Sequence, residues 1–493
     1  MKDYTIPFYR YKKFGDRYLI TTDYGSWYFL ERDEFLKFHS DDIDEELFKK
    51  LEEKNIIATK DNKLNIENKK FKNDWYRSNG NSLHIIIPTL RCNFTCKYCY
   101  AYRRGEDEKG YDMTDETLNK TVDFIFKTPA KSIAIEFSGG EPLLRFDLVK
   151  KAVLKAEELK EETGKEVDYA VVTNAVYLDK EKLDFLRKYK IGVCLSFDGV
   201  KKVHDYHRKI TKDPKKSTYE IVKKKIKWLK EEEEYPYVFA IPVITDHSFK
   251  YWKEIIDEYI ELDINVYRFK YISHFGFASQ QKVWKDLSYN PEKFIKFWKH
   301  TIEYLVELNK KGVKATENIL TYILKKLIQQ DPGFAEMQIP CGATIGQIVY
   351  DYDGSIYPCD EARTMSEFKI GSVHESSYRD VITHSTTKAM VSTSSLVESC
   401  YNCSYYPFCG ICPLELYKMD GTFISNIPSS YRCKIHKSMF DFVFEEIEKD
   451  DDFEGMMEDL IMNSKSAPRF EDEEDDNKSN DKEFKKRTES WES

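Results

Sequence analysis

Three cysteines lie within eight positions of one another, directly after an apolar segment. The stretch reads TLRCNFTCKYCYAYR and contains Cys92, Cys96 and Cys99. Structural zinc sites take four ligands, often from paired C-x2-C motifs, and a [4Fe–4S] cluster also normally takes four thiolates. The spacing here is C-x3-C-x2-C, and no fourth cysteine or histidine is available in the local sequence. Three thiolates on a four-iron cluster would leave one iron open to bind a small molecule, as catalytic metal sites do.

A second group of cysteines lies in the C-terminal part of the chain. Its members are Cys341, Cys359, Cys400, Cys403, Cys409, Cys412 and Cys433. Because reducing compartments keep thiols free, clustered cysteines in a cytoplasmic chain indicate metal ligation rather than disulfides. A zinc site at the C-x2-C pair is one interpretation, but seven cysteines fit two iron–sulfur clusters better than one zinc ion. The isolated Cys194 lies in an apolar segment, where a free cysteine behaves as a small apolar residue.

Composition and charge exclude some classes of function. Lys and Arg number 77, Asp and Glu number 86, and the formal net charge is −9. This balance argues against nucleic acid as the main partner, because phosphate contacts need a basic surface. No apolar run approaches the ~20 residues that span a bilayer, and the first residues, MKDYTIPFYRYKK, lack an apolar signal core. We therefore expect a cytoplasmic protein with no nucleic-acid and no membrane partner.

The elements that must position the first cysteines alternate between strands and helices. Expected strands span 83–89, 131–137, 167–173, 190–197, 237–245 and 265–272, and expected helices between them span 114–127, 146–163, 179–189, 217–233 and 248–261. Apolar strands that alternate with helices predict a parallel sheet, because parallel neighbours need crossover connections. The fold class is therefore α/β, a partial (βα)6 version of the TIM-type barrel with its chemistry at the carboxyl ends of the strands. The first cysteines follow the first strand.

Other segments flank this barrel, which we place at residues 79–330. Residues 1–78 combine a β-hairpin and short amphipathic helices in a winged-helix-like order, and they form either a structural cap or a binding module. Residues 331–445 carry the second cysteine group, and the sequence there is rich in loops, which predicts structure held by metal rather than by a large apolar core. Residues 446–493 form a charged tail that we expect to be largely disordered.

The first cysteine motif resembles that of radical S-adenosylmethionine (SAM) enzymes, C-x3-C-x-φ-C, in which the aromatic position φ is Tyr98 here. The resemblance implies a [4Fe–4S] cluster whose open iron binds the amino and carboxylate groups of SAM. Such enzymes cleave SAM to methionine and a 5′-deoxyadenosyl radical, which removes a hydrogen atom from the substrate. The cofactor supplies this chemistry, and the protein positions it.

Further marks of that family follow in order along the chain. The resemblance implies that SGGEPLL binds the SAM amino group, that Ser196 contacts the ribose, and that the guanidinium fork of Arg208 binds the SAM carboxylate. The SAM-binding residues implied in this way are Tyr98, Gly139, Gly140, Glu141, Pro142, Asn174, Ser196 and Arg208. Each motif follows one of four successive expected strands, although Asp198 in LSFDG is equally compatible with a simple turn.

The second cysteine group resembles the SPASM extension of peptide-modifying radical SAM enzymes. GSIYPC and CYNCSYYPFCGIC match its pattern, except that two residues rather than three separate Cys409 from Cys412. The resemblance assigns Cys400, Cys403, Cys409 and Cys433 to one auxiliary [4Fe–4S] cluster and Cys341, Cys359 and Cys412 to another. It thus implies three [4Fe–4S] clusters, and the three-cysteine auxiliary cluster either has an open iron or takes a non-cysteine ligand.

Asp360 follows Cys359 directly in YPCDEA. In anaerobic sulfatase-maturing enzymes, which this stretch resembles, an aspartate at this place is thought to act as a base toward the substrate. A carboxylate near a cluster could take a proton as the substrate radical is oxidised. The alternative is an ordinary hydrogen-bonding loop residue.

The N-terminal text FGDRYLITTDYGSWYFLERDEF resembles the start of maturases in His-Xaa-Ser peptide systems. This resemblance implies a unit that captures a leader peptide as an added β-strand. We therefore expect a radical SAM/SPASM maturase that installs a carbon–carbon or thioether crosslink in a ribosomally made precursor peptide. Its partners would be that precursor and an electron donor of the flavodoxin or ferredoxin type. The alternatives are a formylglycine-forming anaerobic sulfatase maturase and, in another class, a non-catalytic iron–sulfur or zinc scaffold or electron carrier.

Overall fold

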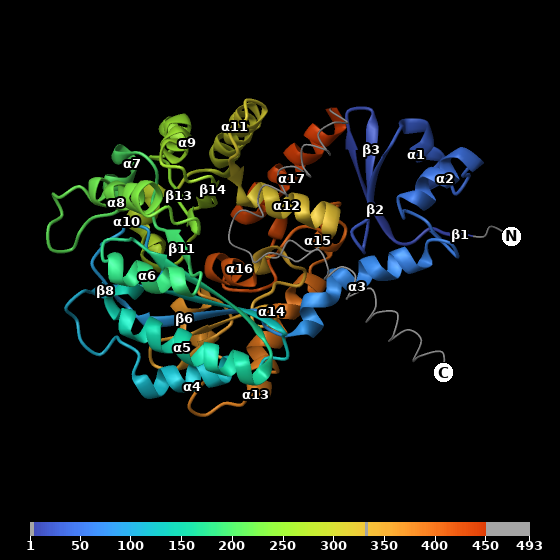
Figure 1. Cartoon of the computed structure of the whole chain (residues 1–493). Coiled ribbons are helices and arrows are strands. Elements are labelled where there is room, and N and C mark those ends of the chain that lie inside the picture. The colour runs from blue at the N-terminus through green and yellow to red at the C-terminus, as the bar shows by residue number, and fades with distance from the viewer. Residues whose placement is uncertain (1–3, 331–333, 450–493) are drawn as a thin grey trace.

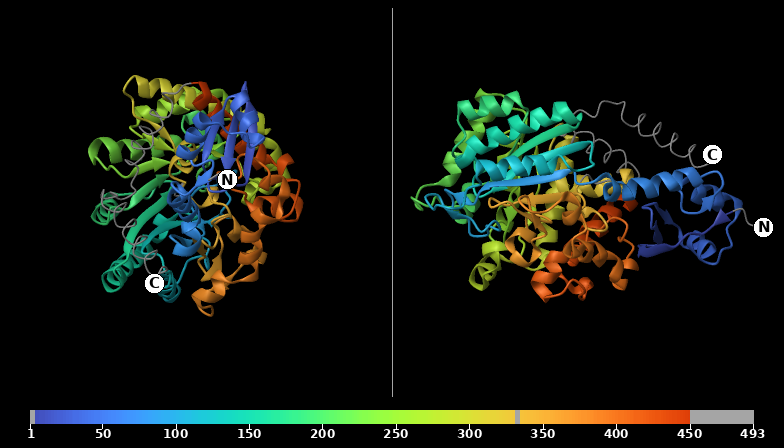
Figure 2. Two further views of the ribbon diagram at one scale, coloured as in Figure 1. Left: turned by 90° about the vertical axis from the view of Figure 1, so that its right-hand side faces the viewer. Right: turned by 90° about the horizontal axis from the view of Figure 1, so that it is seen from below.

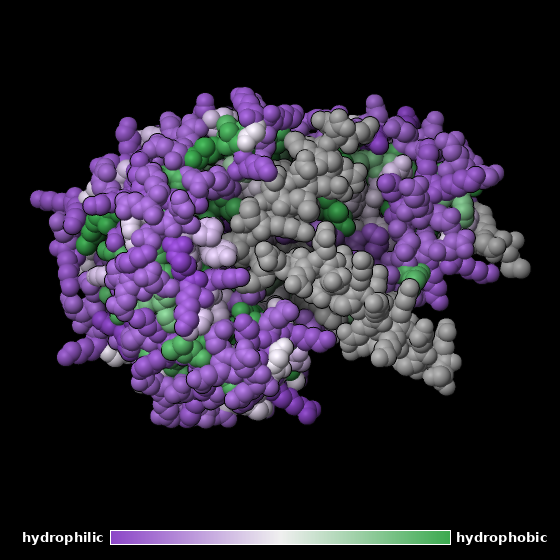
Figure 3. Space-filling model, in the orientation of Figure 1, coloured by the Kyte–Doolittle hydropathy of each residue, from purple (hydrophilic) through white to green (hydrophobic). Residues whose placement is uncertain are grey.

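The computed structural model describes residues 4–330 and 334–449. A large α/β part carries the central sheet, and a small N-terminal part lies at one side of it (Figures 1 and 2). No helix among the described residues is long and apolar enough to cross a membrane. The face drawn in Figure 3 is mostly hydrophilic, with small apolar patches scattered over it.

Six parallel strands form the centre of the large sheet, which confirms the expected fold class. In chain order they are β6 (Leu83–Thr89), β9 (Ser132–Gly139), β10 (Glu166–Thr173), β11 (Gly192–Leu195), β12 (Val238–Ala240) and β14 (Val266–Tyr267). The helices between them are α4 (Asp115–Ile125), α5 (Phe146–Thr163), α6 (Lys180–Lys188), α7 (Lys201–His207), α8 (Thr218–Lys227) and α9 (Trp252–Glu261). The last two expected strands each break in two, because β13 (Val243–Ile244) and β15 (Lys270–Tyr271) leave the main sheet and pair with each other.

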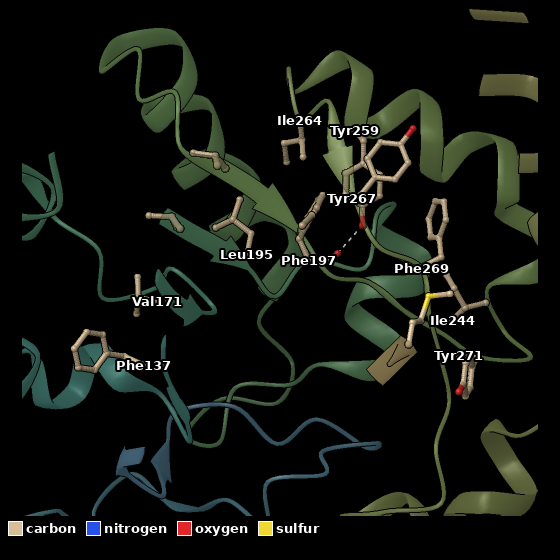
Figure 4. Packing of buried hydrophobic residues seen from close by; sticks show 14 of the residues in the cluster. Phe137, Val171, Leu195, Phe197, Ile244, Tyr259, Ile264, Tyr267, Phe269 and Tyr271 are labelled. Carbon is tan, nitrogen blue, oxygen red and sulfur yellow. Dashed lines mark hydrogen bonds between the residues drawn. The ribbon is translucent and has the colours of Figure 1, made fainter. Parts of the chain in front are cut away.

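Alternation along these strands separates the two faces of the sheet. Phe137, Val171 and Leu195 are fully buried against the covering helices (Figure 4). The Tyr259 hydroxyl of α9 also donates a 2.6 Å hydrogen bond to the carbonyl of Phe197, just beyond β11 (Figure 4). Intervening residues of β9 and β10 are partly accessible, because successive side chains point to opposite faces. These residues line the inside of the curved sheet.

The cysteine-rich part extends the same sheet, which differs from the expectation of a loop-rich unit. β17 (Gln347–Tyr350) pairs in parallel with β6, and β18 (Ser355–Tyr357) and β19 (Gly371–Ser372) follow at the edge. The helices of this part are α13 (Tyr378–Ile382), α14 (Ser385–Leu396), α15 (Glu398–Tyr401), α16 (Pro413–Asp420) and α17 (Tyr431–Lys449). α17 continues past the expected start of the tail at 446, because its apolar face packs into the core through Phe440, Val443 and Phe444. The rest of that tail lies outside the described residues.

Helices α10 (Gln281–Leu287), α11 (Pro291–Lys310) and α12 (Asn318–Gln329) connect the barrel to the cysteine-rich part, with the short strand β16 (Thr316–Glu317) parallel to β14. The small strands β7 (Arg91–Cys92) and β8 (Arg104–Gly105) pair within the first cysteine loop. The pairing of β17 with β6 places the carboxyl end of β6 beside the second group of cysteines.

The N-terminal part contains a three-stranded antiparallel sheet. Its strands are β2 (Tyr9–Phe14), β3 (Arg17–Thr22) and β4 (Trp27–Leu30), and the helices that follow are α1 (Arg32–His39), α2 (Glu45–Glu53) and α3 (Lys63–Asn79), with a short β1–β5 pair (Tyr4–Thr5 and Ala58–Thr59). The sequence pattern indicated the β3–β4 hairpin, α1 and α2, but not β2 or α3. Phe35, Phe38 and Leu47 of the helices cover one face of this sheet.

The other face of the N-terminal sheet packs on the cysteine-rich part. Phe14, Trp27 and Phe29 surround Phe444 of α17, with ring centroids 5.5–6.3 Å apart. Thr21 donates a 2.9 Å hydrogen bond from its hydroxyl to the carbonyl of Ser404. The N-terminal part is therefore built against the second group of cysteines.

Replacing Phe444 by alanine should lower the free energy of unfolding by about 3–5 kcal/mol, because it leaves a cavity between the two parts. Chemical unfolding of the reconstituted protein measures this loss. Leu36 is 53% exposed on α1, so Leu36→Ala should change stability by no more than about 0.5 kcal/mol. Equal losses for the two variants would contradict a packed junction.

Candidate active site

The first cysteine loop is held on two sides by backbone hydrogen bonds. Thr95 donates its amide to the carbonyl of Lys209 at 2.7 Å, and Lys97 donates to that of His207 at 3.0 Å. On the opposite side, the amide of Phe277 donates to the carbonyl of Cys99 at 2.9 Å. These bonds fix the loop at the carboxyl end of β6 without using any cysteine side chain.

The three thiols of this loop gather at one place. Cys92 is buried, and Cys96 and Cys99 are partly buried. Burial, and then the neighbouring Cys96, raise the pKa of the Cys92 thiol well above its usual value. Burial raises the pKa of Cys96 to about 12, although Arg208 opposes this rise. Burial and close neighbours thus make the ionised form of these thiols unfavourable, and metal ligation offsets this because a bound metal stabilises the thiolates. The three thiols therefore fit a metal centre.

Gly139 and Gly140 allow the end of β9 to approach the cysteine loop. A Cβ on Gly140 would lie 2.2 Å from the carbonyl oxygen of Arg91, and one on Gly139 would lie 2.5 Å from Cγ2 of Ile87. Gly139 also has a φ of +111°, which L side chains rarely adopt. The sequence predicted that these glycines allow close approach to a ligand, and the structure adds that they allow close approach to the loop backbone.

Glu141 and Asn174 connect neighbouring strand ends beneath that loop. The Glu141 carboxylate accepts hydrogen bonds from the Thr173 hydroxyl at 2.6 Å, the Asn174 amide at 2.9 Å and the Leu143 amide at 3.1 Å. Burial raises the pKa of Glu141 to about 7 against these bonds. The Asn174 side chain donates to Oδ1 of Asn93 in the cysteine loop at 2.7 Å. Both predicted residues thus position the loop.

Pro142 and Ser196 are two further predicted SAM-binding residues, and they lie beside the strand ends that Glu141 and Asn174 connect. Pro142 is the buried first residue of a 3-10 turn, Pro142–Arg145. Ser196 is half-buried directly after β11, and its amide donates to the carbonyl of Thr173 at 2.9 Å. Their contacts with SAM stay predictions.

Asp198 is a buried centre of hydrogen bonds rather than a turn residue. Arg208 donates to it from Nε at 3.0 Å and from Nη2 at 3.1 Å, the Tyr98 hydroxyl donates as well, and the Val243 amide donates at 3.2 Å. Although burial opposes ionisation, the Arg208 guanidinium holds the pKa of Asp198 well below its usual range. An aspartate before a glycine is also a turn signal, so the sequence could not separate the two roles.

The ion pair between Asp198 and Arg208 changes the SAM-binding role expected of Arg208. Its fork already binds Asp198, and Nη1 lies 3.8 Å from Sγ of Cys96. A SAM carboxylate would therefore have to share this guanidinium with Asp198 rather than occupy a free fork.

The structure brings together the four cysteines that the resemblance assigned to one auxiliary cluster, which we call the second cysteine set. These are Cys400, Cys403, Cys409 and Cys433. Burial, and in addition the neighbouring thiols of this set, raise the pKa of Cys400, Cys409 and Cys433. His436, which the sequence pattern did not single out, places Nδ1 3.8 Å from Sγ of Cys409. Residues 400–404 also form the surface that the N-terminal sheet contacts.

Cys341, Cys359 and Cys412 lie together in the wall of a cavity between the barrel and the cysteine-rich part. Burial raises the pKa of all three thiols, and Cys412 is near enough to contribute to the rise at Cys359. Arg268 and Lys270 of the barrel share this wall with three carboxylates of the cysteine-rich part, Glu336, Glu361 and Glu415. These three thiols, which we call the third cysteine set, therefore face the cavity on the inner side of the curved sheet.

Asp360 lies between the first cysteine loop and this third set. Burial, and next the Asp360 carboxylate, raise the pKa of Tyr100, which follows Cys99 in the chain. Nζ of Lys270 lies 5.2 Å from the ring centroid of Tyr100 and 3.2 Å from the carboxylate of Glu361. Asp360 thus lies near Tyr100 of the first cysteine loop and next to Cys359 in the chain, and its role as a base stays a prediction.

The donor sets fit iron–sulfur clusters better than single ions. In the part of the chain that the structure describes, no three His, Cys, Asp or Glu side chains converge to hold one metal ion. A four-iron cluster instead binds each thiolate through a separate iron, so its ligands surround a volume rather than a point. Ten cysteines gathered in three sets suit that geometry.

Asp198→Asn should destabilise the folded protein by about 3–5 kcal/mol, because it leaves the buried Arg208 without its charge partner. Chemical unfolding checks this value. Asp147 forms an exposed pair with Arg145 at 2.8 Å, and Asp147→Asn should cost only about 0–1 kcal/mol. A small loss for Asp198→Asn would show that its charge is not needed.

Gly140→Ala should displace the first cysteine loop, because the new Cβ meets backbone rather than a flexible side chain. We expect the iron content after reconstitution to fall by about four atoms per chain, the content of one cluster. Gly164 has a positive φ but nothing within 4 Å of its Cβ position, so Gly164→Ala should keep its iron. Full iron content in Gly140→Ala would count against this packing.

Comparison with known proteins agrees with this arrangement. Residues 86–259 match the radical SAM superfamily, and residues 341–404 match the SPASM iron–sulfur cluster-binding domain. The cysteine-type anaerobic sulfatase-maturating enzyme of Clostridium perfringens is 23% identical over 369 residues, which cover 74% of this chain and 96% of that protein.

Two solved structures share the fold. anSMEcpe with bound AdoMet covers 74% of this chain and 98% of its own, at a TM-score of 0.63 and 20% identity. SuiB of Streptococcus suis bound to the precursor peptide SuiA covers 88% of this chain and 98% of its own, at a TM-score of 0.53 and 15% identity. The chain therefore contains a radical SAM domain and a SPASM domain, whose cysteines gather at the ends of the sheet.

Proposed function

We propose that this enzyme installs a carbon–carbon or thioether crosslink in a ribosomally made precursor peptide. The observation that carries the proposal is the N-terminal three-stranded part, which packs directly on the residues around Cys400 and Cys403. The sulfatase-maturating relative matches 74% of this chain with 96% of its own length, so this chain has a substantial part that the relative lacks. SuiB, which binds a precursor peptide, shares the fold over 88% of the chain.

The N-terminal sheet offers edges on which a leader peptide could add a strand. Its order is β2–β3–β4, so β2 and β4 each pair with one strand among the described residues. Phe8 and Tyr11, at the β2 edge, are 47% and 52% exposed. Added-strand binding uses free backbone groups for affinity and such side chains for selectivity. We propose the β2 edge, next to the second cysteine set, as one place for the leader.

The chain's own residues supply positioning and proton transfer. Cys92, Cys96 and Cys99 would hold one [4Fe–4S] cluster, and the other two sets would each hold an auxiliary one. With SAM, the first cluster supplies hydrogen-atom abstraction from the substrate. Crosslinking removes two hydrogen atoms from the peptide in total. The second would leave as a proton, taken by the Asp360 carboxylate, and as an electron, which a bound auxiliary cluster would accept.

Anaerobic reconstitution of the full chain tests the class of chemistry. We expect about twelve iron atoms per chain, for three four-iron clusters, and cleavage of SAM to 5′-deoxyadenosine on reduction by a flavodoxin or ferredoxin. A precursor peptide encoded beside the gene should lose two hydrogen atoms and gain no aldehyde, as seen by mass spectrometry. Zinc without SAM cleavage would support the scaffold alternative instead.

Formation of formylglycine in a sulfatase is the second candidate. The position of Asp360 between Tyr100 and the third cysteine set favours it, because oxidation of a Ser or Cys side chain also needs a base. An aldehyde product reacts with hydrazide probes, whereas a crosslinked peptide does not. Hydrazide labelling of a sulfatase-derived peptide, with no change in the precursor peptide, would replace crosslinking by this function.

A further inference from the structure

Among the described residues, one cation in the wall of the cavity beside Cys341, Cys359 and Cys412 has no hydrogen-bond or ion-pair partner. Among the described residues its wall carries Arg268, Lys270 and Arg432. Lys270 pairs with Glu361 at 3.2 Å. Arg432 lies 3.7 Å from Glu415 and donates to the Tyr271 hydroxyl at 2.8 Å. The guanidinium of Arg268 forms no hydrogen bond or ion pair within the described part of the chain.

Arg268 is nevertheless fixed in place. Its amide donates to the carbonyl of Ala240 at 3.0 Å, directly after β14, and its guanidinium lies 5.0 Å from the ring centroid of Phe334. Its Nε is buried and has no hydrogen-bond partner. A buried donor without an acceptor is costly, so a guanidinium held in a cavity in this way indicates a ligand that completes it.

The charges around Arg268 decide which acceptor fits. Glu336 and Glu136 are the carboxylates that stabilise its charge, with Glu336 the stronger, and neither forms an ion pair with it. The carboxylates Glu361 and Glu415 lie in the same wall as Glu336. A further carboxylate would meet like charges here, whereas a neutral carbonyl oxygen accepts from the guanidinium without adding charge.

We propose that Arg268 donates hydrogen bonds to a backbone carbonyl of the peptide substrate and thereby holds an extended peptide segment along the third cysteine set. This inference rests on the proposed function, because it needs a peptide in the cavity. A backbone carbonyl is present at every residue, so the contact sets the register and depth of the peptide rather than selecting a side chain. Arg268 is then a substrate-binding residue of the barrel, in the same cavity wall as Glu361.

The test compares Arg268→Met and Arg268→Lys in the reconstituted full chain, with the labelled precursor peptide as the probe. Arg268→Met should weaken peptide binding about 10-fold or more, because a hydrogen bond to a charged group is lost, and Arg268→Lys should restore part of it. Thermal stability should stay equal or rise in Arg268→Met, because a partly buried charge without an ion-pair partner is removed. SAM affinity should not change.

Arg363 supplies the matched control. It is a buried arginine whose Nη2 donates to the carbonyl of Ala101 at 2.7 Å and whose Nη1 lies 3.5 Å from Asp351. Arg363→Met should therefore lower thermal stability. A comparable loss of stability in Arg268→Met would assign Arg268 a structural role and overturn the inference.

The remaining outcomes are also decisive. Equal peptide affinity in wild type and Arg268→Met, with the peptide still modified, would overturn this inference and leave the proposed function intact. Loss of SAM affinity would identify the SAM carboxylate as the ligand instead. An effect that disappears when every acidic residue of the peptide is replaced by its amide would identify a peptide carboxylate. Failure of the wild type to bind or modify the precursor would overturn the proposed function, and this inference with it.

Discussion

The close approach of the β9 end to the first cysteine loop is the constraint on which the site depends. Gly140 lies against the backbone of Leu90 and Arg91, where no side chain fits. This contact brings the amides of Gly140 and Glu141 to the carbonyls of Thr89 and Arg91, at 2.9 and 2.8 Å. Because parallel strands end at one edge of the sheet, the loop, the Glu141 bridge and the Asp198 centre all gather there.

The pairing of β17 with β6 is a second constraint on the site. It makes the cysteine-rich part a continuation of the barrel sheet, so that Asp360 and the third set of thiols face the inside of the barrel. A separate domain on a flexible linker could not hold a carboxylate in a constant position between two cysteine sites. The cavity with Arg268 in its wall is a product of this shared sheet.

The N-terminal part is equally integrated. Arg10 donates to the carbonyl of Tyr401, and its guanidinium lies 4.7–4.8 Å from the ring centroids of Phe8, Tyr401 and Tyr406. Tyr401 lies between Cys400 and Cys403 in the chain. A peptide bound at the β2 edge would therefore lie within a few residues of the second cysteine set, which gives the proposed leader site a direct physical connection to it.

The sequence by itself determined the cysteine sets, the glycines beside the first loop and the order of strands and helices, because spacing and periodicity are local properties of the chain. It could not show that Asp198 is a buried partner of Arg208, that β17 joins the barrel sheet, or that α17 continues through Lys449. Only the tertiary structure decided these points, since burial and charge pairing depend on residues far apart in the chain. Arg268 illustrates the reason: nothing beside it in the sequence shows that its guanidinium lacks a hydrogen-bond or ion-pair partner among the described residues, and only the packed cavity shows this.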